Sequence, residues 1–300
     1  MPKLKILLVG GEGQVAFELR RTLACLGEVV VRGRGTAPAL DLADLDGIRA
    51  AVRDIRPHLI VNAAAYTAVD KAEQEMDLAF RINGDAVGVL AEEANAAGAA
   101  LIHYSTDYVF PGDGNAPYRE DDAAGPLGAY GRSKLAGEEA IRTVGGPHLI
   151  LRTAWVYGRR GGNFLLTMLR LMKEREFLRV VDDQQGAPTW SRLIAESTAL
   201  LIARASRDGR IELGDKTGTY HLTCGGETTL FGFAQKIREL GLTQGLLPDT
   251  CSRLEAIPTS GYPTPAKRPA YSVLSNDKLH QEFDLVLPDW EAALRLCLAD

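Results

Sequence analysis

The sequence predicts a doubly wound α/β fold, in which helices cover both faces of a parallel sheet. Three observations support this prediction. Short apolar runs alternate with Ala-rich helical stretches, the runs are apolar at almost every position, and a glycine-rich turn follows the first run. Strands buried on both faces are apolar throughout, and strand–helix alternation is typical of a parallel sheet.

The expected elements alternate through the first half of the chain. Strands are expected at 6–9, 28–31, 59–62, 100–105 and 148–151. Helices are expected between them at 14–25, 45–54, 77–97 and 131–144. In the first helix Val15, Leu19 and Leu23 recur at a helical spacing, which predicts one apolar face.

After about Tyr157 the alternation loosens, and Pro and Gly become frequent at 185–189 and 258–265. Such segments suit a smaller domain whose loops surround a ligand. Helices at 191–205 and 230–240 and a strand at 219–223 indicate that the chain returns to the sheet. We therefore predict a nucleotide-binding domain from residues 1–158 and 186–224, and a smaller, discontinuous α/β substrate domain from 159–185 and 225–300.

Composition limits the classes of function. A net charge of −5 disfavours general nucleic-acid binding, although a few local cations suffice for an anionic substrate. The apolar run at 6–9 is too short for a signal peptide or a membrane span. The four cysteines are scattered without metal spacing, which favours a reduced, cytoplasmic setting.

The turn after the first strand has the spacing Gly10-x-x-Gly13-x-x-Ala16 and leads into a helix. Glycine permits a tight turn and a close approach of the backbone to a pyrophosphate, which the helix N-terminus then binds. This arrangement predicts a Rossmann-type nucleotide site. The second strand ends in Arg32 and Arg34 rather than in a carboxylate, which favours NADPH over NADH.

Two alternatives remain open at this turn. Arg32 and Arg34 are also compatible with solvated surface arginines that bind no ligand. Asp41 and Leu42 follow, and Asp41 either lies near the adenine or caps the next helix.

Tyr130 and Lys134 have the spacing YxxxK at the start of a helix, so their side chains share one face. A neighbouring ammonium lowers a tyrosine pKa by about 1–3 units, which would make Tyr130 a usable general acid. Lys134 could also bind a ribose hydroxyl of the cofactor. Thr106, which follows the strand at 100–105, would orient a substrate carbonyl oxygen.

Longer motifs carry a resemblance to a known family. They are GQV at 13–15, VNAAAYTAVDKAE at 61–73, YSTDYVF at 104–110, YGRSKLAGE at 130–138, RTAWVY at 152–157, DQQGAPT at 183–189 and YPTP at 262–265. With them the chain resembles the extended short-chain dehydrogenase/reductase superfamily and, within it, the dTDP-4-dehydrorhamnose reductase family. The likeness covers nearly the whole chain.

The resemblance implies that NADPH, with NADH as a possible substitute, reduces the C4 keto group of dTDP-4-dehydro-6-deoxy-L-mannose to give dTDP-L-rhamnose. Tyr130 would supply the proton to O4. The implied substrate contacts are Thr106, Asp107, Tyr108 and Trp155, with Asn163 and Arg268 at the nucleotide or diphosphate end. The implied cofactor contacts are Gly10, Gly13, Gln14, Val15, Arg32, Arg34, Asp41, Leu42, Ala63, Ala64, Ala65, Tyr130 and Lys134.

The chain departs from some relatives, which dimerise through a magnesium ion held by glutamates on three segments. Glu18 and Glu291 match two of these positions, but Arg192 occupies the third. Because a cation beside carboxylates opposes metal binding, we predict no metal site. A monomer and a homodimer both remain possible.

Two other functions are weighed against the reductase. A sugar-nucleotide dehydratase of this superfamily would have Thr-Asp-Glu after the strand, whereas this chain has Thr106-Asp107-Tyr108. An epimerase would hold NAD tightly, which the arginines after the second strand disfavour. An NADP-binding regulatory subunit without catalysis would not need Tyr130 and Lys134.

Overall fold

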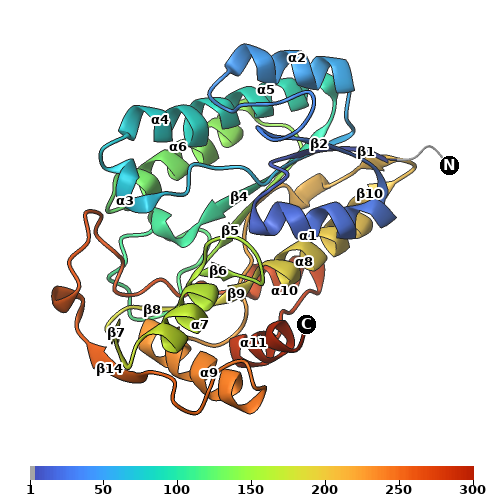
Figure 1. The fold of residues 1–300 in the computed structure, drawn as a ribbon. Helices are drawn as coiled ribbons and strands as arrows, with labels where there is room; N and C mark the ends of the chain where they lie inside the picture. Colours follow the sequence, from blue (N-terminus) through green and yellow to red (C-terminus); the bar gives the residue numbers. More distant parts are fainter. Residues whose placement is uncertain (1–3) are drawn as a thin grey trace.

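The structure is a computed structural model that describes residues 4–300. At its centre lies a six-stranded sheet in the order β12-β5-β4-β3-β1-β2 (Figure 1), and every neighbouring pair in it is parallel. The doubly wound α/β prediction is thereby confirmed. The strands of this sheet are β1 (Leu4–Val9), β2 (Gly27–Arg32), β3 (Leu59–Asn62), β4 (Ala100–Thr106), β5 (His148–Thr153) and β12 (Gly218–His221).

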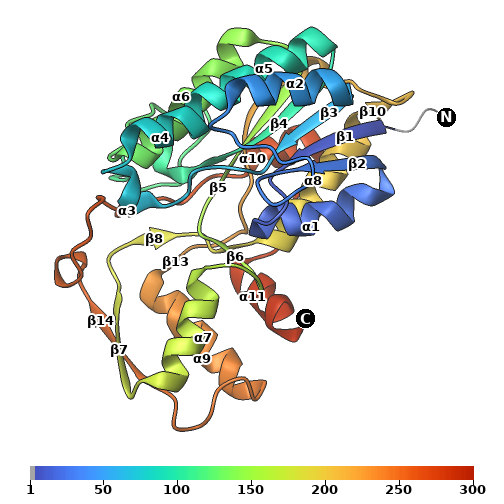
Figure 2. The same ribbon diagram turned by 45° about the horizontal axis from the view of Figure 1, so that its top comes forward.

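Both faces of the sheet are covered by helices (Figure 2). Ile6 and Leu8 of β1 join a core with α1 and α8, while Leu7 and Val9 join a second core with α2 and α5. This alternation explains why the strand is apolar at consecutive positions. The helices are α1 (Gln14–Thr22), η1 (Leu23–Cys25), α2 (Leu45–Ile55), α5 (Ala86–Ala97), α6 (Ala129–Val144) and α8 (Ser191–Ala205).

The helix expected at 77–97 is three pieces rather than one. It consists of α4 (Met76–Phe80), a π-helical turn η2 (Arg81–Asp85) and α5, with α3 (Val69–Ala72) before them. The turn contains Asn83, which is buried and bonds Tyr66 on both its N–H and its carbonyl. Asn83 also donates to the Ser133 hydroxyl at 3.0 Å. A π-turn admits this polar side chain into the helix packing, which a helical periodicity does not reveal.

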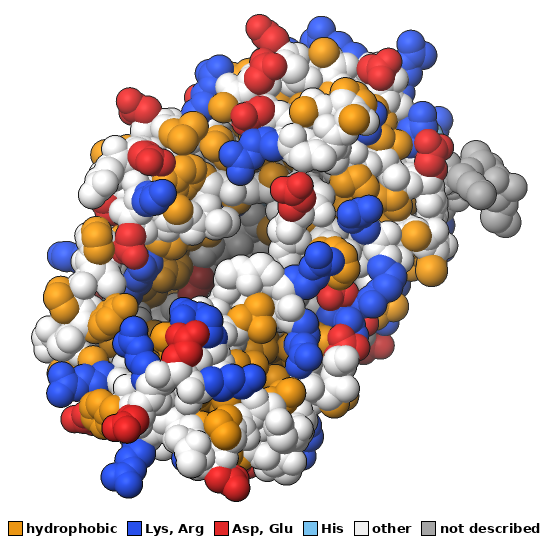
Figure 3. All heavy atoms as spheres, viewed as in Figure 1, with side chains coloured by type: hydrophobic (Ala, Val, Ile, Leu, Met, Phe, Trp, Pro, Cys, Tyr) orange, Lys and Arg blue, Asp and Glu red, His pale blue; other side chains and the backbone are white. Residues whose placement is uncertain are grey.

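A second part of the chain packs around its own apolar cluster, which includes Met172, Phe233 and Trp290. Figure 3 shows the surface hollowed between this part and the sheet. Its elements are β6 (Val156–Tyr157), α7 (Phe164–Glu174), β7 (Phe177–Val181), β8 (Gln185–Gly186), β9 (Thr189–Trp190), β13 (Thr228–Thr229), α9 (Leu230–Thr243), β14 (Arg253–Ile257), η5 (Thr259–Gly261) and α11 (Trp290–Ala299).

The return of the chain to the sheet is confirmed by β12, which pairs with β5. The division into two domains stays a prediction. Helix α10 (Asp277–Phe283), which that division assigns to the substrate domain, places Leu279 and Phe283 in the core beneath the sheet. The remaining short elements are η3 (Asp107–Val109), β10 (Ser206–Arg207), β11 (Arg210–Ile211) and η4 (Gly214–Lys216). Within residues 4–300, every helix is too short or too polar to span a membrane.

Candidate active site

The glycine turn between β1 and α1 opens a cavity of about 570 Å³ at the carboxyl ends of the strands. Gly10 has φ +94°, and a Cβ built on it would lie 2.9 Å from the Cβ of Ala64. No side chain caps the N-terminus of α1, so its first N–H groups are available to a ligand. The predicted cofactor residues that line the cavity are Gly10, Gly13, Arg34, Asp41, Leu42, Ala63, Ala64 and Ala65.

Five predicted cofactor residues do not line this cavity. Two of them, Tyr130 and Lys134, lie in the first turns of α6, and the other three have other surroundings. Arg32 donates to the carbonyl of Val31, the residue before it, at 3.0 Å. Val15 packs against the core below the sheet. Gln14 accepts a hydrogen bond from Asn163 at 2.8 Å. Of the two arginines after the second strand, Arg34 is therefore the one that lines the cavity.

Asp41 does not cap the helix that follows it. The cap of α2 is Asp44, whose carboxylate accepts from the Gly47 N–H at 3.0 Å. Asp41 instead accepts from the Ala43 N–H at 2.9 Å, in a local turn at the rim of the cavity. Its carboxylate is therefore compatible with a contact to an adenine.

Thr106 and Tyr130 lie together at the carboxyl end of β4, where α6 begins. Burial raises the pKa of the Tyr130 phenol well above its usual value, and a hydrogen bond with the Thr106 hydroxyl opposes that shift. The Tyr108 ring meets the Tyr130 ring edge-on, with 5.6 Å between their centroids. Tyr130 is consequently a neutral phenol at physiological pH, which is the form that donates a proton.

The expectation that Lys134 lowers the pKa of Tyr130 is wrong for this structure. Lys134 is 2% exposed, and its Nζ atom is directed at β4, where it donates to the carbonyl of Tyr104 at 2.7 Å. The i,i+4 spacing puts the two side chains on one helix face, but tertiary partners decide where the amine points. Burial governs the pKa of Tyr130 instead.

Asp107 follows Thr106 and is also buried, at 2% exposure. Its Oδ1 atom accepts from the Thr106 hydroxyl at 2.9 Å. Burial raises the pKa of the Asp107 carboxyl to about 6, although hydrogen bonds partly offset this effect. Asp107 therefore changes its charge close to physiological pH.

The remaining predicted substrate residues follow β5 in the chain. Arg268 pairs with Asp70 at 2.8 Å and also lies against Tyr108. Trp155 has φ +45°, and its ring covers Gly186, where a Cβ would lie 2.5 Å from the indole. Backbone in this region is rare for a bulky residue and recurs at ligand sites.

Asn163 has a structural use that the sequence did not reveal. Its Oδ1 atom caps α7 by accepting from the Leu166 N–H at 3.0 Å, and its amide donates to Gln14. The structure thus gathers Thr106, Asp107, Tyr108, Tyr130 and Arg268, whereas Asn163 lies beside the start of α1.

A buried ion pair holds α6 against the sheet, and sequence reasoning missed it. Glu138 is 0% exposed and accepts two bonds from the Arg152 guanidinium, at 2.9 and 2.7 Å. Ser105, the neighbour of Thr106, donates to the same carboxylate at 2.5 Å. These hydrogen bonds hold the pKa of Glu138 below its usual value against the effect of burial.

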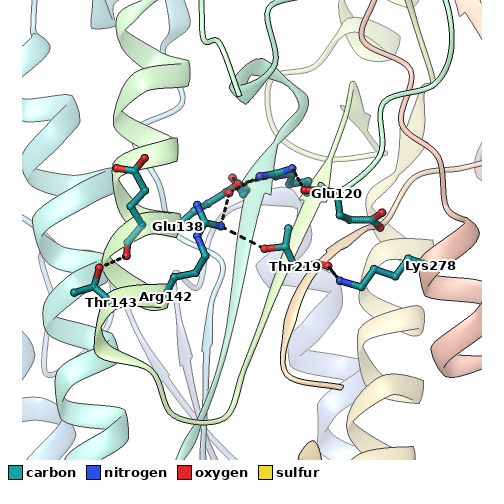
Figure 4. Close-up of polar contacts among 9 residues, drawn as sticks. Glu120, Glu138, Arg142, Thr143, Thr219 and Lys278 are labelled. Atoms are coloured by element: carbon teal, nitrogen blue, oxygen red, sulfur yellow. Dashed lines mark hydrogen bonds and ion pairs between the residues drawn. The ribbon is translucent and has the colours of Figure 1, made fainter. Parts of the chain in front are cut away.

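Figure 4 shows the outer side of this ion pair. The Arg142 guanidinium lies between Glu138 and Thr219, at 3.1 and 3.4 Å, and Lys278 donates to the Thr219 carbonyl at 2.8 Å. The Glu138 carboxylate therefore connects α6 to β4, β5 and β12. The only signal for it in the sequence is a glutamate one helical turn after Lys134.

The start of α6 is fixed by a side chain from a distant segment. Gly128 supplies no cap, and the Ala129 N–H donates instead to the Glu73 carboxylate at 2.8 Å. A carboxylate is favourable at a helix N-terminus. Glu73 thereby fixes the first turn of α6, which contains Tyr130.

At the positions considered for a metal, Arg192 binds Glu18 at 3.3 Å and Asp300 at 2.5 Å. Glu291 pairs with Lys236 at 3.1 Å. Among residues 4–300, no group of three His, Cys, Asp or Glu side chains has the arrangement of a metal site. The absence of a resident metal stays a prediction.

The parallel sheet, the glycine turn and the set of Thr106, Tyr130 and Lys134 define an oxidoreductase of the short-chain dehydrogenase/reductase class. The family described as RmlD substrate binding domain matches residues 4–300. The dTDP-4-dehydrorhamnose reductase of Burkholderia thailandensis is 49% identical over 298 residues and covers 99% of both chains. The chain belongs to the dTDP-4-dehydrorhamnose reductase family.

Other relatives agree in sequence and structure. The dTDP-4-dehydrorhamnose reductase of Escherichia coli (strain K12) is 47% identical, over 98% of this chain and 97% of its own. The Clostridium acetobutylicum dTDP-4-dehydrorhamnose reductase structure has a TM-score of 0.88 at 34% identity, with 99% of both chains covered. The Bacillus anthracis enzyme, in complex with NADP, has a TM-score of 0.87 at 32% identity with the same coverage.

Proposed function

We propose that the protein catalyses the reduction of the C4 keto group of dTDP-4-dehydro-6-deoxy-L-mannose by NADPH, giving dTDP-L-rhamnose. The observation that supports this most strongly is a phenol, Tyr130, held protonated beside Thr106 in a chain similar over its full length to dTDP-4-dehydrorhamnose reductases. We further propose that the enzyme works in the cytoplasm, since its four cysteines are all free thiols. Monomeric and homodimeric forms both fit this proposal.

The cavity at the glycine turn fits a dinucleotide. Gly10 leaves room that a Cβ would fill, and the uncapped start of α1 offers N–H groups to a pyrophosphate. Arg34 at its rim supplies a cation suited to a 2′-phosphate. When bound, NADPH would supply the hydride to C4.

The residues of the chain would supply orientation and the proton. Tyr130 remains a phenol at neutral pH, so its O–H can protonate the O4 atom as negative charge develops there. The Thr106 hydroxyl, which donates to Asp107 in this structure, would turn its proton to that oxygen and hold it in reach of the phenol. Arg268, after release from Asp70, has a guanidinium free to bind a diphosphate.

The test is turnover with purified protein. With NADPH and dTDP-4-dehydro-6-deoxy-L-mannose, nicotinamide absorbance at 340 nm should fall and dTDP-L-rhamnose should form in equal amount. UDP-glucose with NAD serves as the control for an epimerase. No loss of absorbance with a substrate that a known family member consumes would contradict the proposal.

A further inference from the structure

The amino group of Lys134 contacts two residues of β4, the strand that ends in Thr106. Its Nζ atom donates to the Tyr104 carbonyl at 2.7 Å and lies 3.1 Å from Nε2 of His103. Lys134 is 2% exposed and His103 is 1% exposed. One strand, β4, therefore both orients Lys134 and ends in Thr106.

A third buried side chain, that of Asn62, contacts His103 on the side away from Lys134. Nδ2 of Asn62 lies 3.1 Å from Nδ1 of His103, and these two residues are register partners in the β3–β4 pair. Oδ1 of Asn62 accepts from the Ala64 N–H at 3.2 Å, and Ala64 lines the cofactor cavity. Hydrogen bonds thus run from the wall of that cavity through Asn62 and His103 to Lys134.

His103 differs from an ordinary core histidine. His148, on the neighbouring strand, is a buried histidine whose Nδ1 contacts the backbone carbonyl of Gly146 at 2.9 Å. Both ring nitrogens of His103 instead contact side chains, one of them the amine of Lys134. An aliphatic side chain would fill a central strand without the desolvation penalty of an imidazole. The contact with Lys134 is what the imidazole adds.

The hydrogen bonds of Asn62 fix where the imidazole carries its proton. Because Oδ1 accepts from Ala64, Nδ2 presents an N–H to Nδ1 of His103, which must be the unprotonated nitrogen. The proton of the neutral ring is then on Nε2, facing Lys134. Such an N–H can donate to a neutral amine, but it cannot accept from an ammonium.

We propose that His103 is a positioning residue for Lys134: Asn62 holds the ring, and its Nε2–H sets both the direction of the amino group and the pH at which it becomes an ammonium. The proposal rests on the proposed reductase function. His103 precedes Thr106 by three residues on β4 and does not line the cofactor cavity.

The charges around Lys134 are consistent with this role. Burial lowers the pKa of Lys134 to about 8, and the Glu138 carboxylate on its own helix acts in the opposite direction. Burial and the nearby Lys134 amine lower the pKa of His103 well below its usual value, so the ring stays neutral. Tyr130, the other titratable group on this helix face, is a neutral phenol. When Lys134 is protonated, its ammonium thus faces the Nε2–H of His103, which disfavours the charged form.

The first experiment does not depend on turnover. Protein labelled with ¹⁵N-histidine is titrated by NMR from pH 5 to 8, and the signals of His103 are assigned by their loss in His103→Gln. The five imidazoles of the chain should include one that stays neutral and carries its proton on Nε2. A His103 ring that titrates near its usual pH, or carries the proton on Nδ1, would overturn the proposal.

The second experiment measures kcat and its pH profile for two variants. His103→Leu removes the partner of Lys134 and should lower kcat about 2- to 10-fold, the range for loss of one hydrogen bond between neutral groups. The pH profile is expected to have an alkaline limb, in which kcat falls as Lys134 loses its proton. His103→Gln offers a carbonyl oxygen that accepts from an ammonium, so it should recover much of kcat and move this limb to higher pH. His148→Leu is the matched control and should keep the original profile, because His148 is a buried histidine at the start of the neighbouring strand β5 and contacts the Gly146 carbonyl rather than Lys134.

Equal losses in His103→Leu and His103→Gln, or an alkaline limb that does not move to higher pH in His103→Gln, would assign His103 a structural role only. Folding of each variant is checked by its unfolding midpoint. If the unaltered protein has no turnover, the proposed function fails, and the NMR titration still decides the state of His103.

Discussion

Replacing Glu138 by Gln should lower the free energy of unfolding far more than the same replacement of a surface glutamate would. The side chains of Glu138 and Arg152 are 0% and 4% exposed, so solvent does not screen their interaction. Glu138→Gln leaves the Arg152 guanidinium buried without a counter-charge. Removal of one partner from a buried pair costs about 3–5 kcal/mol, because the other charge is left uncompensated. Arg142, whose side chain is 41% exposed, adds little.

The assay is urea unfolding followed by circular dichroism, with thermal unfolding as a second measure. Unfolding entropy is about 2.1 cal/mol/K per residue, so for 300 residues a loss of about 4 kcal/mol lowers Tm by about 6 °C. Glu174→Gln is the matched control, since Glu174 pairs with Arg170 at the same 2.7 Å distance but on the surface. Its expected loss is below about 0.5 kcal/mol.

The pH dependence supplies a further check. Because the pKa of Glu138 is lowered in the folded protein, its contribution is complete above the ordinary carboxyl value of 4.5 and is lost as pH falls below it. The difference in unfolding free energy between the unaltered protein and Glu138→Gln should therefore decrease only below pH 4.5. A Glu138→Gln variant no less stable than Glu174→Gln at pH 7 would refute this reasoning.

Tyr130→Phe should bind NADPH almost normally and lose at least about 100-fold in kcat, whereas near-normal turnover would exclude the phenol as the acid. Arg34→Ala should raise KM for NADPH about 10-fold or more while KM for NADH changes little. Arg32→Ala, whose guanidinium is directed at its own backbone, is its control, and equal effects on the two cofactors would contradict a 2′-phosphate contact. The Asp107 carboxyl has a pKa of about 6, and its ionised form is the one that accepts from Thr106. In the unaltered protein kcat/KM should therefore decrease as the pH falls below about 6, whereas in Asp107→Asn kcat/KM should not change with pH in this range.

Local patterns predicted the fold and much of the site. The continuous apolar strands identified the sheet, and the ends of β1 and β4 located the cavity and Thr106. Helical spacing put Tyr130 and Lys134 on one face of α6. These inferences need only residues close together in sequence.

What remained hidden depends on pairing between distant segments. His103 meets Asn62 through the β3–β4 register, and Glu138 meets Arg152 through the packing of α6 on β5. Neither partner can be chosen before that register is known. The direction of the Lys134 amine could not be predicted for the same reason, since Tyr104 and His103 determine it.

The late position of β12 and α10 in the chain bears on how the protein forms during synthesis. Five strands of the sheet are complete once β5 has emerged, but the edge strand follows about 65 residues later, at Gly218–His221. Leu279 and Phe283, which complete the core beneath the sheet, come later still. A nascent chain that stops after β5 therefore exposes apolar surface on that face. The nucleotide-binding half should become resistant to protease only near the end of translation, together with the half that follows it.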